Sequence, residues 1–148
     1  MKAIAQFAFV LIVSAGFAFS TTTADKPALQ ELRARADAAQ GQYCAEICVD
    51  AAAALVDSAD KLFTEGNAEQ GHQQMKDAVT YAEKATKGSI QSNKRQKKTE
   101  IGLRKLSRRM TEIRQTLAID DRPPMDELIN AVEKMRTALL MSMFDEKK

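Results

Sequence analysis

Residues 103–139, LRKLSRRMTEIRQTLAIDDRPPMDELINAVEKMRTAL, decide the fold of this chain. Apolar residues recur along this stretch at alternating spacings of three and four, which places one apolar seam on each of two helices, as in coiled coils. The Asp-Asp-Arg-Pro-Pro segment at 120–124 separates the two seams, because proline cannot continue a helix but fits its first turn. The seam residues are Leu103, Leu106, Met110, Ile113 and Leu117, then Met125, Leu128, Val132, Met135 and Leu139.

Similar spacing upstream predicts a second helical hairpin. One apolar stripe runs from Cys44 to Leu62, Gly66 ends that helix, and a narrow face from Gly71 to Ala85 follows, with Gly88 as its expected end. Helix-forming residues dominate, and no alternating run of β-branched residues is long enough for a strand. We therefore predict an all-α, up-down antiparallel helical bundle built from two αα-hairpins, residues 42–88 and 92–144, with a helical N-terminal extension.

The first 24 residues have the order of a secretory signal peptide. A positive start, Met1-Lys2, precedes the uncharged and mostly apolar residues 3–19, and small residues follow at 20–24. We expect residues 1–24 to be removed, leaving a single all-α domain at 25–148 with no transmembrane segment, exported to the periplasm or outside the cell. The alternative is an uncleaved N-terminal membrane anchor, since a stretch of 17 uncharged, mostly apolar residues is near the shortest length that spans a bilayer.

The first hairpin resembles one tetratricopeptide unit over residues 55–83. Leu55, Ala59 and Leu62 match the unit's first helix, a Gly-containing turn follows at 65–67, and Gly71, Met75 and Ala78 match its second helix. The pattern departs at Glu83, where the family usually has proline. The resemblance implies helical-hairpin packing and not a peptide-binding array, because no second copy follows and such repeats need about three to be stable.

Cys44 and Cys48 are the two cysteines, four residues apart on the core-facing stripe. They could be buried thiols that pack as small hydrophobic groups, or a strained local disulfide, since disulfides need a specific Cβ geometry. They could also pair with another chain or bind a soft metal. The single histidine, His72, lies too far along the hairpin to join them and is expected at the surface of its helix.

Residues 94–114 form a strongly basic segment, with nine bases against two acids. Four of these bases are expected on the outer side of their helix: Arg104, Lys105, Arg108 and Arg109. They predict an anion-binding surface for phospholipid or a polyanionic envelope polymer. The alternative is a solvated face that pairs with neighbouring acids. Nucleic acid is disfavoured as a partner, because no aromatic side chain near the segment could stack on bases.

We find no motif for catalysis, whether a phosphate-binding loop, a zinc pattern or a nucleophile with a nearby base. The sequence therefore favours an exported interaction or structural module that binds a protein or an anionic envelope component, without a cofactor and without enzyme activity. The sequence is also compatible with a homodimer. The alternative function is a thiol-redox or soft-metal-binding protein that uses Cys44 and Cys48.

The signal assignment predicts the N-terminus of the mature protein. N-terminal sequencing of exported material should begin at Thr21 or Asp25, or within a few residues of them, because small residues precede both positions. Recovery of the chain from a membrane fraction with Met1 intact would instead favour the anchor.

Overall fold

The computed structural model describes residues 25–145, which are helical almost throughout. The elements in order are α1 (Asp25–Ala38), α2 (Gly41–Thr64), α3 (Ala68–Ser92), α4 (Gln96–Thr116), the short 3₁₀ helix η1 (Ile119–Asp121) and α5 (Arg122–Asp145). The predicted all-α helical bundle is confirmed. The signal-peptide prediction falls on residues 1–24, which lie outside the described part of the chain.

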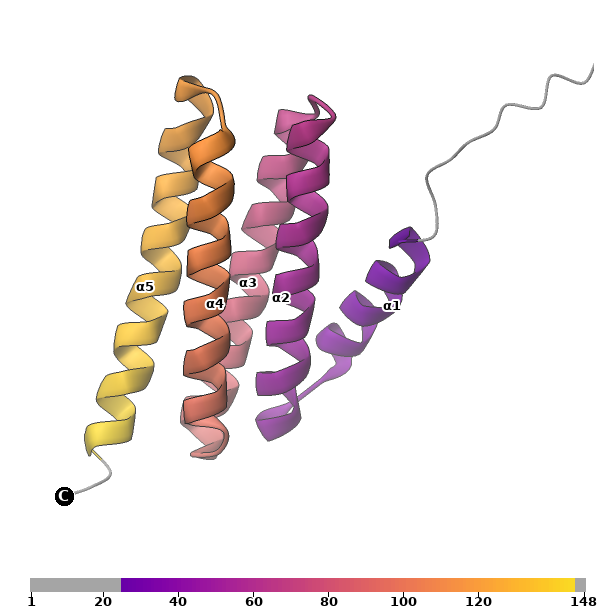
Figure 1. Cartoon of the computed structure of the whole chain (residues 1–148). Coiled ribbons are helices and arrows are strands. Elements are labelled where there is room, and N and C mark those ends of the chain that lie inside the picture. The colour runs from indigo at the N-terminus through magenta and orange to yellow at the C-terminus, as the bar shows by residue number, and fades with distance from the viewer. Residues whose placement is uncertain (1–24, 146–148) are drawn as a thin grey trace, which may run out of the picture.

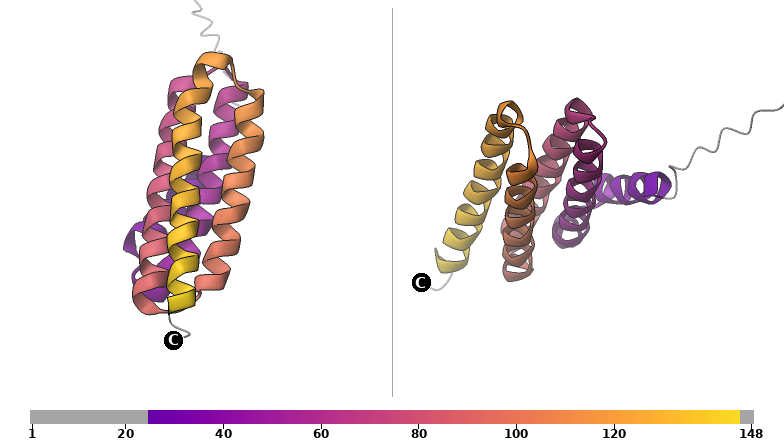
Figure 2. Two further views of the ribbon diagram at one scale, coloured as in Figure 1. Left: turned by 90° about the vertical axis from the view of Figure 1, so that its left-hand side faces the viewer. Right: turned by 45° about the horizontal axis from the view of Figure 1, so that its top comes forward.

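Two antiparallel hairpins, α2/α3 and α4/α5, lie side by side and form the four-helix bundle (Figure 1). α2 packs beside α4, and α3 packs beside α5, so that the four helices occupy the corners of a square (Figure 2). α1 leans against the outside of the bundle, mainly on α2. Among the helices of residues 25–145, none combines the length and the apolar character needed to cross a membrane.

The predicted seams form the core of the α4/α5 hairpin. The four seam residues within α4 are buried, and so is Leu117, which directly follows the helix. On α5 the fully buried positions are Met125, Val132 and Leu139, spaced seven apart, whereas Leu128 and Met135 between them are half-buried. The row of Met125, Val132 and Leu139 thus faces the core, whereas Leu128 and Met135 lie at the border between core and solvent. This is expected for a helix at a corner of the bundle.

Small side chains make the core of the α2/α3 hairpin. Ala51, Ala52 and Ala59 on α2, and Ala78, Ala82 and Ala85 on α3, are fully buried. Alanine lets two helix backbones approach closely, and α2 with α3 forms the most extensive helix contact in the molecule. Larger residues such as Leu55 and Met75 fill the space toward the second hairpin.

The predicted helix end at Gly88 is wrong. α3 continues to Ser92, and the chain turns at Asn93, which has the left-handed φ of 54°. Gly88 has a packing role instead, because a Cβ built on it would lie 2.9 Å from the carbonyl oxygen of Gly41. That glycine allows the joint between α1 and α2 to sit directly on α3. The break predicted near Gly41 is confirmed.

Polar contacts attach α1 to α3. Arg33 forms an ion pair with Asp77 at 2.6 Å, and the Tyr81 hydroxyl donates to the Asp37 carboxylate at 2.7 Å. The ammonium of Lys84 donates to the carbonyl oxygens of Ala36 and Asp37, at 2.7 and 2.8 Å. These carbonyls belong to the last turn of α1, where the helix itself supplies no donor and a positive charge is favourable.

The burial pattern of α5 predicts unequal effects of two leucine truncations. Leu139→Ala should lower the free energy of unfolding by about 2–5 kcal/mol, because it empties a fully buried site. Leu128→Ala should cost less than about 2 kcal/mol, because this side chain already contacts solvent. Urea unfolding followed by circular dichroism measures both, and equal costs would contradict this arrangement of α5.

Candidate binding groove between α2 and α4

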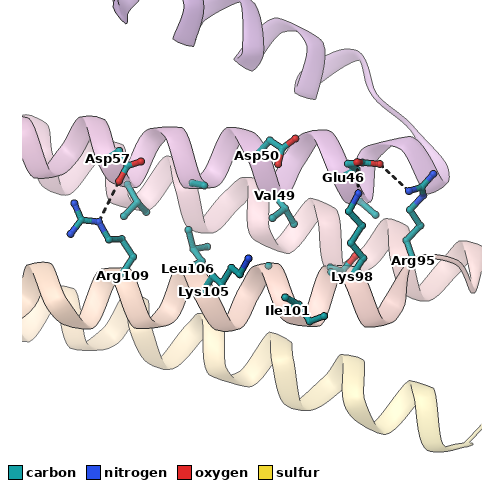
Figure 3. A pocket seen from close by; sticks show the side chains of 15 residues that line it. Glu46, Val49, Asp50, Asp57, Arg95, Lys98, Ile101, Lys105, Leu106 and Arg109 are labelled. Carbon is teal, nitrogen blue, oxygen red and sulfur yellow. Dashed lines mark hydrogen bonds and ion pairs between the residues drawn. The ribbon is translucent and has the colours of Figure 1, made fainter.

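A groove of about 470 Å³ opens between α2 and α4 on the face of the bundle that carries both helices (Figure 3). Its floor is apolar and includes Val49 and Ala53 of α2, and Ile101, Gly102 and Leu106 of α4. Ala53 is exposed, and Val49 and Ile101 are half-buried. The groove therefore presents apolar surface that no other described element covers.

Gly102 determines how closely the two helices approach along this groove. A Cβ built on Gly102 would lie 2.5 Å from Cγ1 of Val49, which is far inside van der Waals contact. The absence of a side chain lets Val49 pack against the backbone of α4. Because the neighbouring α2 residues Ala45 and Ala53 are also small, the surface beside this contact stays hollow.

The two lips of the groove carry opposite charge. The acids Glu46, Asp50 and Asp57 line the side formed by α2. The bases line the side formed by α4; they are Arg95, Lys98, Lys105 and Arg109. The lining charges sum to a single excess positive charge, since four bases face three acids.

Ion pairs join the lips at both ends of the groove. At one end Arg95 Nη1 lies 3.0 Å from Glu46 Oε2, and Lys98 Nζ donates to Oε1 of the same carboxylate. The hydrogen bond and the charge of Lys98 hold the pKa of Glu46 below its usual value. At the other end Arg109 Nε lies 3.3 Å from Asp57 Oδ1. These ion pairs bound the groove at its two ends (Figure 3).

The middle of the groove holds two exposed charges without partners. Within residues 25–145, neither Asp50 of α2 nor Lys105 of α4 has a hydrogen-bond or ion-pair partner. Both side chains stand beside the apolar floor, between the paired ends (Figure 3). The groove thus combines apolar area with charges that remain available to a ligand.

The four bases predicted to bind anions have different surroundings. Arg109 also reaches Asp60 at 2.7 Å, Arg108 pairs with Glu112 of its own helix at 3.2 Å, and Arg104 lies 3.9 Å from Glu100. Glu100 is mainly bound by Arg136 of α5, at 2.9 Å. Lys105 alone among the four has no partner in the described chain, so the freest positive charge of this set lies at the groove.

The two thiols lie together in the core beneath α1. Both cysteines are free and buried, and their Sγ atoms are 2.9 Å apart, because positions four apart share one face of a helix. The Cys48 thiol is 3.6 Å from the carbonyl oxygen of Ala36, and the Cys44 thiol is 3.8 Å from that of Lys84. Burial raises the pKa of Cys48 to about 12, with the neighbouring Cys44 as a further cause.

The expectation for His72 is wrong in one respect. This side chain is largely buried: its ring meets that of Phe63 edge-on at 5.0 Å, and its Nε2 lies 3.4 Å from Asp121 Oδ1. Asp121 belongs to η1, so this short helix lies beside the His72 ring. No group of three or more histidine, cysteine or acidic side chains within residues 25–145 has the arrangement of a metal site.

No protein-family model matches the chain, and neither does any curated protein or solved structure. The properties of the groove are therefore inferred from its geometry alone. The groove was not predicted from the sequence, although two residues of α4 indicate it. Ile101 and Gly102 interrupt the basic face of α4 without belonging to its seam, which is what a helix needs when it faces a second apolar surface.

The environment of the thiols predicts low reactivity. In the folded protein at pH 8, iodoacetamide should leave Cys44 and Cys48 unmodified over a period in which the urea-unfolded chain is fully alkylated. Both sulfurs are buried, and a thiol with a pKa of about 12 is almost wholly protonated at that pH. Mass spectrometry of the intact protein counts the modified thiols, and rapid modification of the folded form would contradict this environment.

Proposed function

We propose that the protein is an exported binding module, without catalytic activity, that holds a ligand or partner in the groove between α2 and α4. The observation that carries the proposal is the combination of an apolar floor with two unpartnered charges at its centre, Asp50 and Lys105. The volume, about 470 Å³, lies in the range of sites that bind small molecules, and such sites are mostly apolar with a few polar groups that orient the ligand.

The residue types in the groove favour binding over catalysis. Its fifteen lining residues include acids, bases and apolar side chains, but neither histidine nor cysteine, and the one hydroxyl, that of Thr99, is buried. A nucleophile next to a base is the usual requirement for covalent catalysis, and this lining supplies none.

A thiol-redox or soft-metal function for Cys44 and Cys48 is the second candidate. The observation that favours it is the Sγ–Sγ distance of 2.9 Å, which places the two thiols close enough for an external two-electron oxidant to join them as a disulfide after a small movement. Burial under α1 and the raised pKa of Cys48 weigh against it, because thiolates at accessible sites are the reactive species. The alkylation experiment above separates the two candidates.

The proposal predicts that a fluorescent apolar probe binds the folded protein at this groove. 1-Anilinonaphthalene-8-sulfonate should bind the wild-type protein with a rise in fluorescence, because the dye emits strongly on apolar surface. Ala53→Phe should reduce binding at least about tenfold, since the new ring would occupy the floor at an exposed position. Fluorescence titration measures the affinity.

Ala138→Phe provides the matched control for this experiment. It places the same ring at an exposed position of α5, outside the groove. This variant should bind the dye as the wild type does, and thermal melts should show that both variants are folded. Dye binding that both variants reduce equally, or that neither reduces, would contradict the groove as the binding site.

A further inference from the structure

We propose that the ligand of the α2/α4 groove is a single-chain amphiphile with one acidic headgroup, of the class of medium-chain fatty carboxylates. This inference rests on the proposed function and names its ligand. Three properties of the groove lead to it: its length, the position of its one unpartnered cation, and the unpartnered acid on the opposite lip.

The position of Lys105 and the ion pair at the end of the groove limit the length of an apolar chain. Lys98, which pairs with Glu46 at that end, precedes Lys105 by seven positions along α4, which corresponds to about 10 Å at ~1.5 Å per residue. An extended hydrocarbon chain advances about 1.3 Å per carbon, given carbon–carbon bonds near 1.5 Å. A chain of about eight carbons therefore matches the distance between a headgroup at Lys105 and the end of the groove at Glu46.

The floor offers this chain a continuous apolar contact. Val49 and Ala53 from α2 face Ile101 and Leu106 from α4, and the bare backbone at Gly102 lies between them. Ile101 is half-buried in a helix whose outer face is otherwise basic, so part of its side chain faces the groove. An aliphatic chain laid over these residues would remove this surface from water, which is the main driving force for binding of apolar groups.

Lys105 is the group that would receive the headgroup. Arg95 and Lys98 both contact Glu46, and Arg109 contacts Asp57, so these three cations are already paired. Lys105 has no partner within the described chain and stands beside the floor at mid-groove. A carboxylate there would gain a charge-assisted hydrogen bond from the ammonium without breaking an existing pair.

Asp50 restricts the charge of that headgroup. Its exposed, unpartnered carboxylate lies on the opposite lip of the same stretch of groove, so a headgroup with two negative charges would be repelled. Because Arg109 is also paired with Asp60, the one positive charge left for a ligand is that of Lys105, and a single negative charge matches it. The groove therefore suits a monoanionic carboxylate better than a phosphate monoester.

The test uses octanoate, an eight-carbon carboxylate, with isothermal titration calorimetry on the full-length mature protein. Lys105→Gln should weaken octanoate binding about three- to tenfold, as expected for loss of a partly exposed charged hydrogen bond. Lys97→Gln is the matched control, because Lys97 is an exposed base of the same helix outside the groove, and it should leave the affinity unchanged. Asp50→Asn should tighten binding of octyl phosphate more than binding of octanoate.

Four results would overturn the inference. Three of them are octylamine binding as tightly as octanoate, equal losses in the Lys105→Gln and Lys97→Gln variants, and octanoate binding that survives in Ala53→Phe. The fourth is binding to anionic phospholipid vesicles without binding of free octanoate, which would favour a bilayer surface. Failure with octanoate while the anilinonaphthalene dye still binds in an Ala53-dependent manner would reject this ligand class and leave the proposed groove function in place.

Discussion

The small side chains along α2 are the constraint on which the rest of this structure depends. On the side of α2 that faces α3, Ala51, Ala52 and Ala59 allow an intimate hairpin. On the side that faces α4, Ala45 and Ala53 with Val49 provide too little volume to fill the space between the two helices. The small apolar residues of one helix therefore produce both the close contact with α3 and the groove beside α4.

In the second hairpin, α4 forms the other side of the groove. The seam of leucine, isoleucine and methionine on α4 is buried against α5 and α3. A rotation of α4 that covered the hollow would therefore expose Leu103 and Met110. The side of α4 that faces α2 therefore carries the residues outside the seam, which are a glycine, one isoleucine and a row of bases. The ion pairs across the groove align the lips at its ends, and such exposed pairs contribute more to geometry than to stability.

Local patterns in the sequence were enough to predict the helices and their antiparallel order. The three-and-four spacing and the Asp-Asp-Arg-Pro-Pro turn specify α4 and α5 directly, because both depend on neighbouring residues only. The end of α3 could not be read this way, since Gly88 serves a contact with Gly41, 47 positions earlier in the chain. The groove could not be predicted for the same reason. Which acids pair with Arg109, and whether Lys105 finds a partner, depends on which helices become neighbours.

The manner in which α1 is attached has a consequence for the hierarchy of motions in this molecule. α1 is held by polar contacts to α3 and by a small apolar contact, in which Ala36 is fully buried and Leu29 and Leu32 are partly buried, whereas α2–α5 supply the rest of the apolar core. Because α1 packs on the outside of the bundle, mainly against α2, we expect it to detach before the four-helix bundle unfolds. Ala36 covers the Cys48 sulfur, so this detachment is the shortest route by which solvent reaches the thiols. The rate at which they exchange with reagents then measures the free energy that holds α1 in place, and not the global stability of the fold.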